Sequence, residues 1–361
     1  MNPRIPVLSV CVPTYDRCEV LADLLATVMP QLHACEGQVE LVISDNASTD
    51  GTPGLLESLR SEVDVRVHRH TANLGMAANI MFAAQQIARG KYVWVVGDDD
   101  LIPPGSLNRV LDLIATHPDV PFFFVNTHVA PAASRAEVSA LIAEAGTSWL
   151  GTGIPGQRKG RLAGRVRMSS WAELVDPLID DVFLGALMCG VCRADVWRKT
   201  SVTCEPSGPR FHALRHAYPH CLVYARGGLI GQPAVYEEAP CTIAFFGDQE
   251  WISTELRMLL LVWQQELLEE YARAGVPRSR VEYCRGVLLE RSRGLLTATL
   301  LEPQNSQDRQ RFSLRRFMWL NRHQGRTLFA SLDQVARQLA SASLPHPMYS
   351  ALRTAKKRVA N

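Results

Sequence analysis

The 361-residue chain has no apolar run long enough to span a bilayer, and its strongest, Met258 to Trp263, is far too short. The N-terminal residues lack the charged-then-apolar layout and the small-residue cleavage site of a secretory signal. We therefore expect a cytoplasmic protein that is neither exported nor integral to a membrane. No GxGxxG follows the first apolar run, which argues against a dinucleotide-dependent dehydrogenase.

Cysteine is present but lacks the spacing of a metal site. The nine cysteines form an odd set, and only Cys189 and Cys192 have CxxC spacing, with no second pair following at the distance of a zinc site. Several of them lie within apolar stretches, where a thiol behaves as a small core residue. We expect reduced thiols.

The composition, 47% hydrophobic and 20% charged, is that of a soluble globular protein. The net charge is only +2, but residues 303–361 hold eleven Lys and Arg against two Asp and Glu. Because basic and aromatic residues alternate there, notably around Trp319, this region predicts contact with the inner-membrane surface. The alternatives are a basic helix packed on the acidic remainder of the molecule and a homodimer contact. No nucleic-acid-binding module is recognisable, so we expect no nucleic-acid partner.

Strand and helix patterns alternate over the first 130 residues. Compact apolar runs occupy 7–12, 39–44, 63–68, 92–96 and 121–126, and amphipathic stretches occupy 19–32, 54–61, 76–88 and 107–116. This order predicts an α/β fold with a doubly wound, mostly parallel sheet flanked by helices.

The rest of the chain divides by pattern. Residues 131–170 lose periodicity and gain Gly, Arg and Lys, which suggests a flexible insert that could act as a lid. Ordered patterning resumes over 171–250, and helical spacing dominates after 251. We therefore predict a domain over 1–250, with halves at 1–130 and 171–250 around the insert, and a C-terminal helical basic region over 251–361.

Polar clusters follow the first, second and fourth of the predicted strands, where doubly wound sheets bind ligands. The strongest is Asp98-Asp99-Asp100, directly after an apolar run. Three adjacent carboxylates repel one another unless a cation is shared, and Mg²⁺ or Mn²⁺ binds one or two carboxylates together with phosphate oxygens. A solvated acidic turn is the alternative. Asp45 ends the second strand, and Asn73-Leu74-Gly75 precedes the third helical stretch.

Together these motifs resemble a known family. Val12 to Arg17 (VPTYDR), Ser44 to Thr52 (SDNASTDGT), Asn73 to Asn79 (NLGMAAN) and Gly97 to Asp100 (GDDD) resemble the family 2 inverting glycosyltransferases, which have the GT-A fold. The resemblance is strong over residues 5–130 and is nearest the bacterial O-antigen branch that includes abequosyltransferases. Asp16 departs from the family, where most members carry Asn.

The resemblance implies a donor site for a nucleotide diphosphate sugar. Its residues would be Pro13, Thr14, Tyr15, Asp16, Arg17, Asp45, Asn46, Asn73, Gly75, Asp98 and Asp99. Within this set Thr14, Tyr15 and Asp45 would hold the base, and Asp98 the ribose or the sugar. Asp99 would be the principal ligand of Mn²⁺ or Mg²⁺, with Asp100 as the alternative register.

The acceptor half is less regular. The family commonly supplies the general base from an acidic pair, and none occurs between Ser201 and Gly231. We predict His220 in this role, because imidazole is a base near neutral pH. His212 and His216 are alternatives, and Glu205 and Asp181 stay open. Trp251 is a predicted platform for the acceptor sugar.

The resemblance also implies an acceptor, a hydroxyl of a glycan or a polyprenyl-linked sugar in bacterial surface polysaccharide synthesis. Such an acceptor would place the protein on the cytosolic face of the inner membrane. Two other functions compete. A sugar-nucleotide-binding protein that has lost its base fits the missing acidic pair, whereas a sugar-phosphate nucleotidyltransferase usually opens with a Gly-rich basic loop, which Pro13-Thr14-Tyr15 is not.

Overall fold

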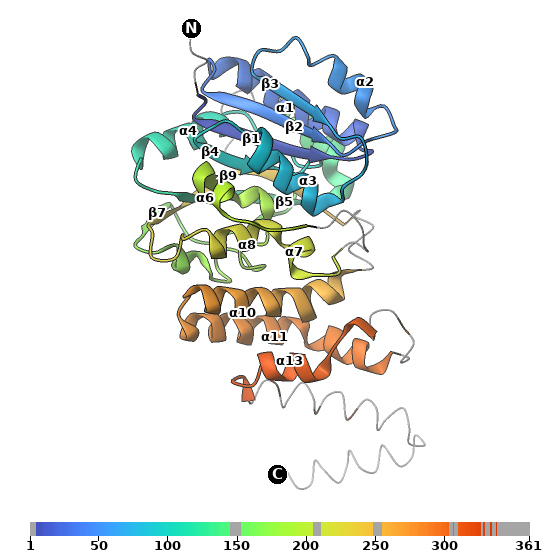
Figure 1. Cartoon of the computed structure of the whole chain (residues 1–361), viewed down its shortest axis with the longest axis vertical. Coiled ribbons are helices and arrows are strands. Elements are labelled where there is room, and N and C mark those ends of the chain that lie inside the picture. Colours follow the sequence, from blue (N-terminus) through green and yellow to red (C-terminus); the bar gives the residue numbers. More distant parts are fainter. Residues whose placement is uncertain are drawn as a thin grey trace.

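The computed structural model describes residues 5–144, 153–204, 211–247, 255–302 and 310–325, together with the single residues Ser306, Leu328, Asp333 and Arg337. An α/β layer, blue to yellow in Figure 1, lies above orange to red helices of the C-terminal region. The division predicted near residue 250 stays a prediction, because 248–254 lie outside the described ranges.

One mixed sheet forms the centre of the α/β layer, with the order β3-β2-β1-β4-β8-β5-β9-β7 and β6 paired to β5. The strands are β1 (Leu8–Thr14), β2 (Val39–Asp45), β3 (Val65–Arg69), β4 (Tyr92–Val95), β5 (Phe122–Pro131), β6 (Gln157–Arg158), β7 (Arg165–Met168), β8 (Gly190–Arg193) and β9 (Ala234–Phe246). Pairing is parallel between β1 and β2, β1 and β4, β2 and β3, and β5 and β9. The predicted fold class is confirmed.

The helices follow the predicted alternation. They are α1 (Cys18–Ala34), α2 (Thr52–Glu57), α3 (Met76–Phe82), α4 (Ser106–Thr116), α5 (Arg135–Glu144), α6 (Ala194–Lys199), α7 (Leu214–Ala217), α8 (Pro219–Arg226), α10 (Gln264–Ala274), α11 (Arg278–Leu301) and α13 (Leu314–Leu320). A π-helical turn, Ala83–Ile87, extends α3, and another, Leu259–Trp263, precedes α10.

Strand alternation divides the core between the two faces of the sheet. Val10 and Val12 of β1 pack with Leu21 and the rest of the apolar stripe of α1. Cys11 points to the other face, in the core that also contains Tyr224 of α8. Because β1 is buried on both faces, its sequence is mostly apolar and does not alternate between apolar and exposed polar residues.

The second core continues into the C-terminal helices. Leu267 and Tyr271 of α10 belong to it, and the Tyr271 hydroxyl donates to the carbonyl of Phe183 at 2.9 Å. In Figure 1, α8 accordingly lies between the sheet and α10. The start of the helical region is thus packed onto the α/β layer.

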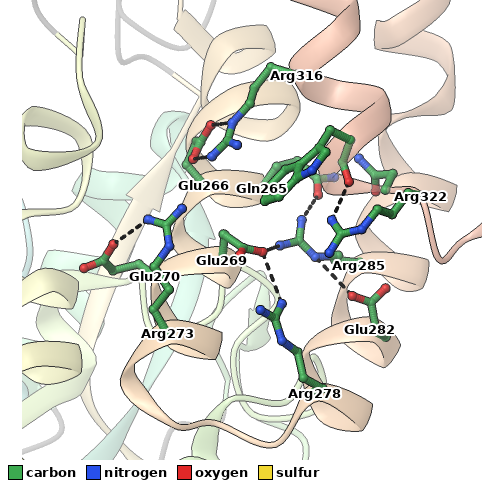
Figure 2. A network of polar contacts seen from close by, with 12 residues as sticks. Gln265, Glu266, Glu269, Glu270, Arg273, Arg278, Glu282, Arg285, Arg316 and Arg322 are labelled. Carbon is green, nitrogen blue, oxygen red and sulfur yellow. Dashed lines mark hydrogen bonds and ion pairs between the residues drawn. The ribbon is translucent and has the colours of Figure 1, made fainter.

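A polar network joins α10, α11 and α13 (Figure 2). Arg285 of α11 is fully buried and donates to Glu269 at 2.9 Å and to Gln265 at 3.1 Å. Arg316 of α13 makes a bidentate contact with Glu266, at 2.6 and 2.7 Å. Basic residues of this region therefore serve partly in internal ion pairs, as in the packed-helix alternative. Within the described ranges, no helix has both the length and the apolar character needed to cross a bilayer.

The predicted insert over 131–170 contributes to the sheet where it is described. It contains α5 and the strands β6 and β7, and β7 pairs antiparallel with β9. Its periodicity is hard to see because β6 and β7 are short and β7 carries Arg165 and Arg167, which pair with acidic side chains of other elements.

Candidate functional site

The predicted polar clusters meet at the carboxyl ends of β1, β2 and β4. Thr14 pairs with Asp45 in the β1–β2 register, and Val95 at the end of β4 pairs with Cys11 of β1. The chain proceeds from β1 toward β3 on one side and resumes at β4 on the other, so this edge is a topological switch point. Such points are where open α/β sheets bind ligands.

Asp98 is buried, and it is the carboxylate of the acidic run that contacts β1. The Thr14 hydroxyl donates to its carboxylate at 2.8 Å, across 84 positions of sequence. Burial, together with the negative charge of Asp99, raises the pKa of Asp98 to about 7, although Arg17 and Thr14 act in the opposite direction. The structure thus joins two of the residues predicted for the donor site.

Asp99 is the most accessible carboxylate of the three. Asp98 and Asp100 are 8% and 3% exposed, whereas Asp99 is half-buried. The Arg17 guanidinium lies 2.6 Å from its Oδ2 and 3.6 Å from Asp98 Oδ1. A cationic side chain therefore already neutralises part of the acidic run.

Asp100 closes the turn instead of facing outward. Its Oδ2 accepts the backbone N–H of Gly97 at 3.0 Å, and burial raises its pKa well above the ordinary value. A Cβ on Gly97 would lie 2.9 Å from carboxylate oxygens of both Asp99 and Asp100, so any larger residue would displace these carboxylates. Of the two metal-ligand candidates, Asp99 is the one with an accessible carboxylate.

Arg135 is a contact of the acidic run that the sequence did not reveal. It belongs to α5, and its Nη2 donates to the backbone carbonyl of Asp99 at 2.5 Å. Its guanidinium also lies 4.1 Å from the centroid of the Phe245 ring and 3.7 Å from Asp23. An arginine 36 positions away in a region without periodicity gives no local signal of this role.

Asp45 and Asn46 organise the loops beside the acidic run. Asp45 is fully buried, its Oδ1 accepts the N–H of Ser48 at 2.9 Å, and its Oδ2 lies 3.2 Å from Arg69 Nε. The side chain of Asn46 donates to Asn73 at 2.8 Å. Asn73 in turn accepts the N–H of Gly75, so the predicted Asn73-Leu74-Gly75 motif is fastened to the end of β2.

The loop after β1 presents the remaining predicted donor residues. Pro13 is half-buried within β1, and Tyr15 is 41% exposed. Asp16 has φ +49°, a left-handed conformation that Asp and Asn tolerate better than most residues. Its carboxylate accepts the N–H of Thr49 at 2.6 Å, and this contact lowers its pKa. Asp can therefore fill a position where Asn is usual.

The prediction of His220 as the base requires correction. His220 is 3% exposed in the core around α8, and its Nε2 lies 3.2 Å from the carbonyl of Leu184. Burial lowers its pKa to about 4. A base must reach the acceptor hydroxyl, directly or through one water, and this imidazole is enclosed by protein.

The other predicted acceptor-side residues differ in accessibility. The rings of His212 and His216 lie 4.1 Å apart, and His212 is the less buried of the two. Asp181 is held between Lys159 at 2.7 Å and Arg291 at 2.6 Å; burial opposes ionisation, but these cations lower its pKa. Trp251 and Glu205 lie outside the described residues.

Comparison with known proteins identifies the domain. Residues 9–156 match Glycosyl transferase family 2. Abequosyltransferase RfbV of Salmonella typhimurium is 34% identical over 116 residues, covering 32% of this chain and 34% of that protein. The putative teichuronic acid biosynthesis glycosyltransferase TuaG of Bacillus subtilis is 28% identical over 113 residues, covering 30% of this chain and 42% of that protein. The chain thus spans less than half the length of each of these relatives.

Two solved structures share the overall arrangement. S. aureus TarS in complex with UDP-GlcNAc has a TM-score of 0.51 and 14% identity, covering 91% of this chain and 82% of that one. The mannosyltransferase PcManGT from Pyrobaculum calidifontis, in complex with GDP-Man and Mn²⁺, has a TM-score of 0.51 and 15% identity, covering 99% and 81%. At these identities the likeness establishes the fold. Residues 9–156 therefore match Glycosyl transferase family 2, and the chain has the GT-A fold of these structures.

Proposed function

We propose that this protein is a metal-dependent inverting glycosyltransferase. It moves a sugar from a nucleotide diphosphate sugar to a hydroxyl of a glycan or polyprenyl-linked acceptor in bacterial surface polysaccharide synthesis. The observation that carries this proposal is the acidic turn after β4, where Asp98 is held by Thr14 and Asp99 keeps an accessible carboxylate. The likeness to an abequosyltransferase and to a putative teichuronic acid biosynthesis glycosyltransferase supports a role in surface polysaccharide synthesis.

The residues of this turn fit a divalent cation. Asp99 offers carboxylate oxygens, the ligands that Mg²⁺ and Mn²⁺ prefer, and Arg17 shows that the turn attracts positive charge. Within the described residues no three His, Cys, Asp or Glu side chains form a group that could hold a metal ion, so the donor's phosphate oxygens would have to complete the coordination. When bound, the cation supplies positive charge that stabilises the leaving nucleoside diphosphate.

The chain's own residues hold the rest of the donor. Tyr15 presents an exposed aromatic ring beside β1 on which a base can stack. Asp45, at the adjacent strand end, is fully buried and positions the following loop by accepting the N–H of Ser48. Asp98, fixed by Thr14, is placed to accept from a hydroxyl of the ribose or the donor sugar.

The acceptor proton needs a separate base. With His220 enclosed in the core and His216 also buried, we assign this role to His212, which precedes α7 and whose ring lies 4.1 Å from that of His216. His212 is the more accessible imidazole. Asp181 is less suited, because its carboxylate is already engaged by two cations.

The membrane assignment rests on α13. Met318 and Trp319 are 41% and 42% exposed, and Arg315 on the same helix is exposed as well. Exposed Trp and Met beside Arg suit the interface of an anionic bilayer. We propose that this face contacts the cytosolic leaflet, where a polyprenyl-linked acceptor is presented.

Release of nucleoside diphosphate from candidate donors tests the function. We expect release with Mn²⁺ or Mg²⁺, and its loss with EDTA or in Asp99→Asn. Asp112→Asn, which alters an exposed carboxylate on α4, is the matched control and should resemble the wild type. Release that survives both EDTA and Asp99→Asn would contradict the metal assignment. A melting temperature that rises with nucleotide, without any release, would indicate a non-catalytic binding protein.

A further inference from the structure

Arg17 is placed to interfere with metal binding in the ligand-free protein. It precedes α1, and its carbonyl accepts the N–H of Leu21 at 3.0 Å, so its backbone is fixed. Its side chain is 38% exposed and reaches across 82 positions of sequence to the acidic run. A fixed backbone and a long exposed side chain allow the guanidinium to change partners.

The position of the guanidinium creates a conflict. Arg17 Nη1 lies 2.6 Å from Asp99 Oδ2 and 3.6 Å from Asp98 Oδ1, so it is bound to the carboxylate proposed for the metal. Two cations at one carboxylate repel each other. A divalent cation therefore gains full access to Asp99 only when Arg17 moves to another anion.

The donor itself supplies that anion. A diphosphate offers oxygens that match the fork of a guanidinium, and such bidentate contacts are among the strongest hydrogen bonds in proteins. Arg135 has no comparable freedom, since it binds the carbonyl of Asp99, not its carboxylate, and packs over Phe245. Arg135 therefore holds the backbone of Asp99, whereas Arg17 neutralises its carboxylate.

We propose that Arg17 is the counter-ion that keeps Asp99 from binding a divalent metal until the donor diphosphate arrives, and that it then transfers to the phosphates. This inference rests on the proposed function. Metal and nucleotide consequently bind the wild-type protein interdependently. Removal of the Arg17 charge opens Asp99 to metal without nucleotide, and it removes one contact to the phosphates.

Mn²⁺ binding measured by electron paramagnetic resonance tests the proposal, without and with saturating UDP or GDP. The proteins are the wild type, Arg17→Met, Arg17→Lys and Arg69→Met. Arg69→Met is the matched control, because it removes a cation from the same edge that pairs with Asp45 and not with the acidic run. Melting temperatures establish that each variant is folded.

We expect Arg17→Met to bind Mn²⁺ about tenfold more tightly than the wild type without nucleotide, as removal of one nearby like charge predicts. Arg17→Lys and Arg69→Met should stay near the wild type. Nucleotide should raise the Mn²⁺ affinity of the wild type more than that of Arg17→Met. Equal or weaker nucleotide-free binding by Arg17→Met overturns the proposal.

A failure of the proposed function has a different signature. If the tighter binding of Arg17→Met persists after Asp99→Asn is added, the metal is not at Asp99, and the metal assignment fails together with this inference. The same holds if none of the proteins binds Mn²⁺ with or without nucleotide. Equal binding by wild type and Arg17→Met that is lost in Asp99→Asn leaves the function intact and refutes only the role of Arg17.

Discussion

Protonation of His220 should destabilise the folded protein in mild acid. Its ordinary pKa of 6.5 falls to about 4 in the structure, because burial disfavours the imidazolium. The unfolded chain therefore binds a proton at a pH where the folded chain does not. The stabilising contribution is complete above the unfolded pKa, declines as the pH falls below about 6.5, and is lost by about pH 4.

The magnitude follows from the two pKa values. Between about pH 7.5 and pH 5, this single group should lower the free energy of unfolding by about 2 kcal/mol. Asp98 acts in the opposite sense, because its raised pKa means that protonation at lower pH favours the folded state. Comparison with a His220 variant cancels that term, since Asp98 is present in both proteins.

Urea unfolding of the wild type and His220→Gln at the two pH values measures the effect. Gln keeps a donor for the carbonyl of Leu184, which His220 Nε2 contacts at 3.2 Å, but it does not titrate. We expect the wild type to lose about 2 kcal/mol more than the variant on acidification. Nucleoside diphosphate release by folded His220→Gln should persist at neutral pH. Parallel pH dependence of the two proteins, or release abolished in a stably folded variant, would refute the view of His220 as a buried core imidazole.

Three further predictions follow from other contacts. Arg135→Met should reduce nucleotide release about tenfold through a raised KM for the donor, because the carbonyl of Asp99 loses a charged hydrogen bond. Arg135→Lys should restore part of the release, and unchanged kinetics in Arg135→Met would contradict a positioning role. Arg285→Met should lower the free energy of unfolding, measured in urea, by about 3 kcal/mol, because it leaves the carboxylate of Glu269 buried without this partner. The double variant Arg285→Met with Glu269→Leu should lose less stability, and additive losses would argue against coupling of the two residues. Replacement of Met318 and Trp319 by Ser should reduce cosedimentation with anionic vesicles, and undiminished cosedimentation would remove α13 from the membrane contact.

Local pattern predicted the first strands of the sheet and the placement of polar residues after them, because each signal lay within one strand and its following turn. The apolar run of Tyr92 to Val95 predicted β4, and the acidic run after it was expected at a ligand-binding edge. Parallel pairing then required Thr14, Asp45 and the acidic run to meet at that edge. The structure adds the contact itself, the hydrogen bond from Thr14 to Asp98.

The residues predicted for the acceptor side were harder to place, because burial and contacts with distant residues decide their surroundings. The sequence does not show whether a given histidine is buried, and only the packing around α8 shows that His220 is enclosed. The insert was also hard to interpret, since β7 owes its place to pairing with β9, a strand remote in sequence. Arg135 could be found only once α5 was seen against the acidic run.

By itself, the sequence determined the order of strands and helices and the edge of the sheet at which the acidic run lies, because hydrophobic period and turn chemistry act over a few residues. Only the tertiary structure decided which carboxylate of that run is accessible, which arginine neutralises it and which histidine is buried. Each of these depends on side chains brought together from remote positions. Asp99 is half-buried beside Arg17, Asp100 is folded onto Gly97, and His220 is enclosed against Leu184.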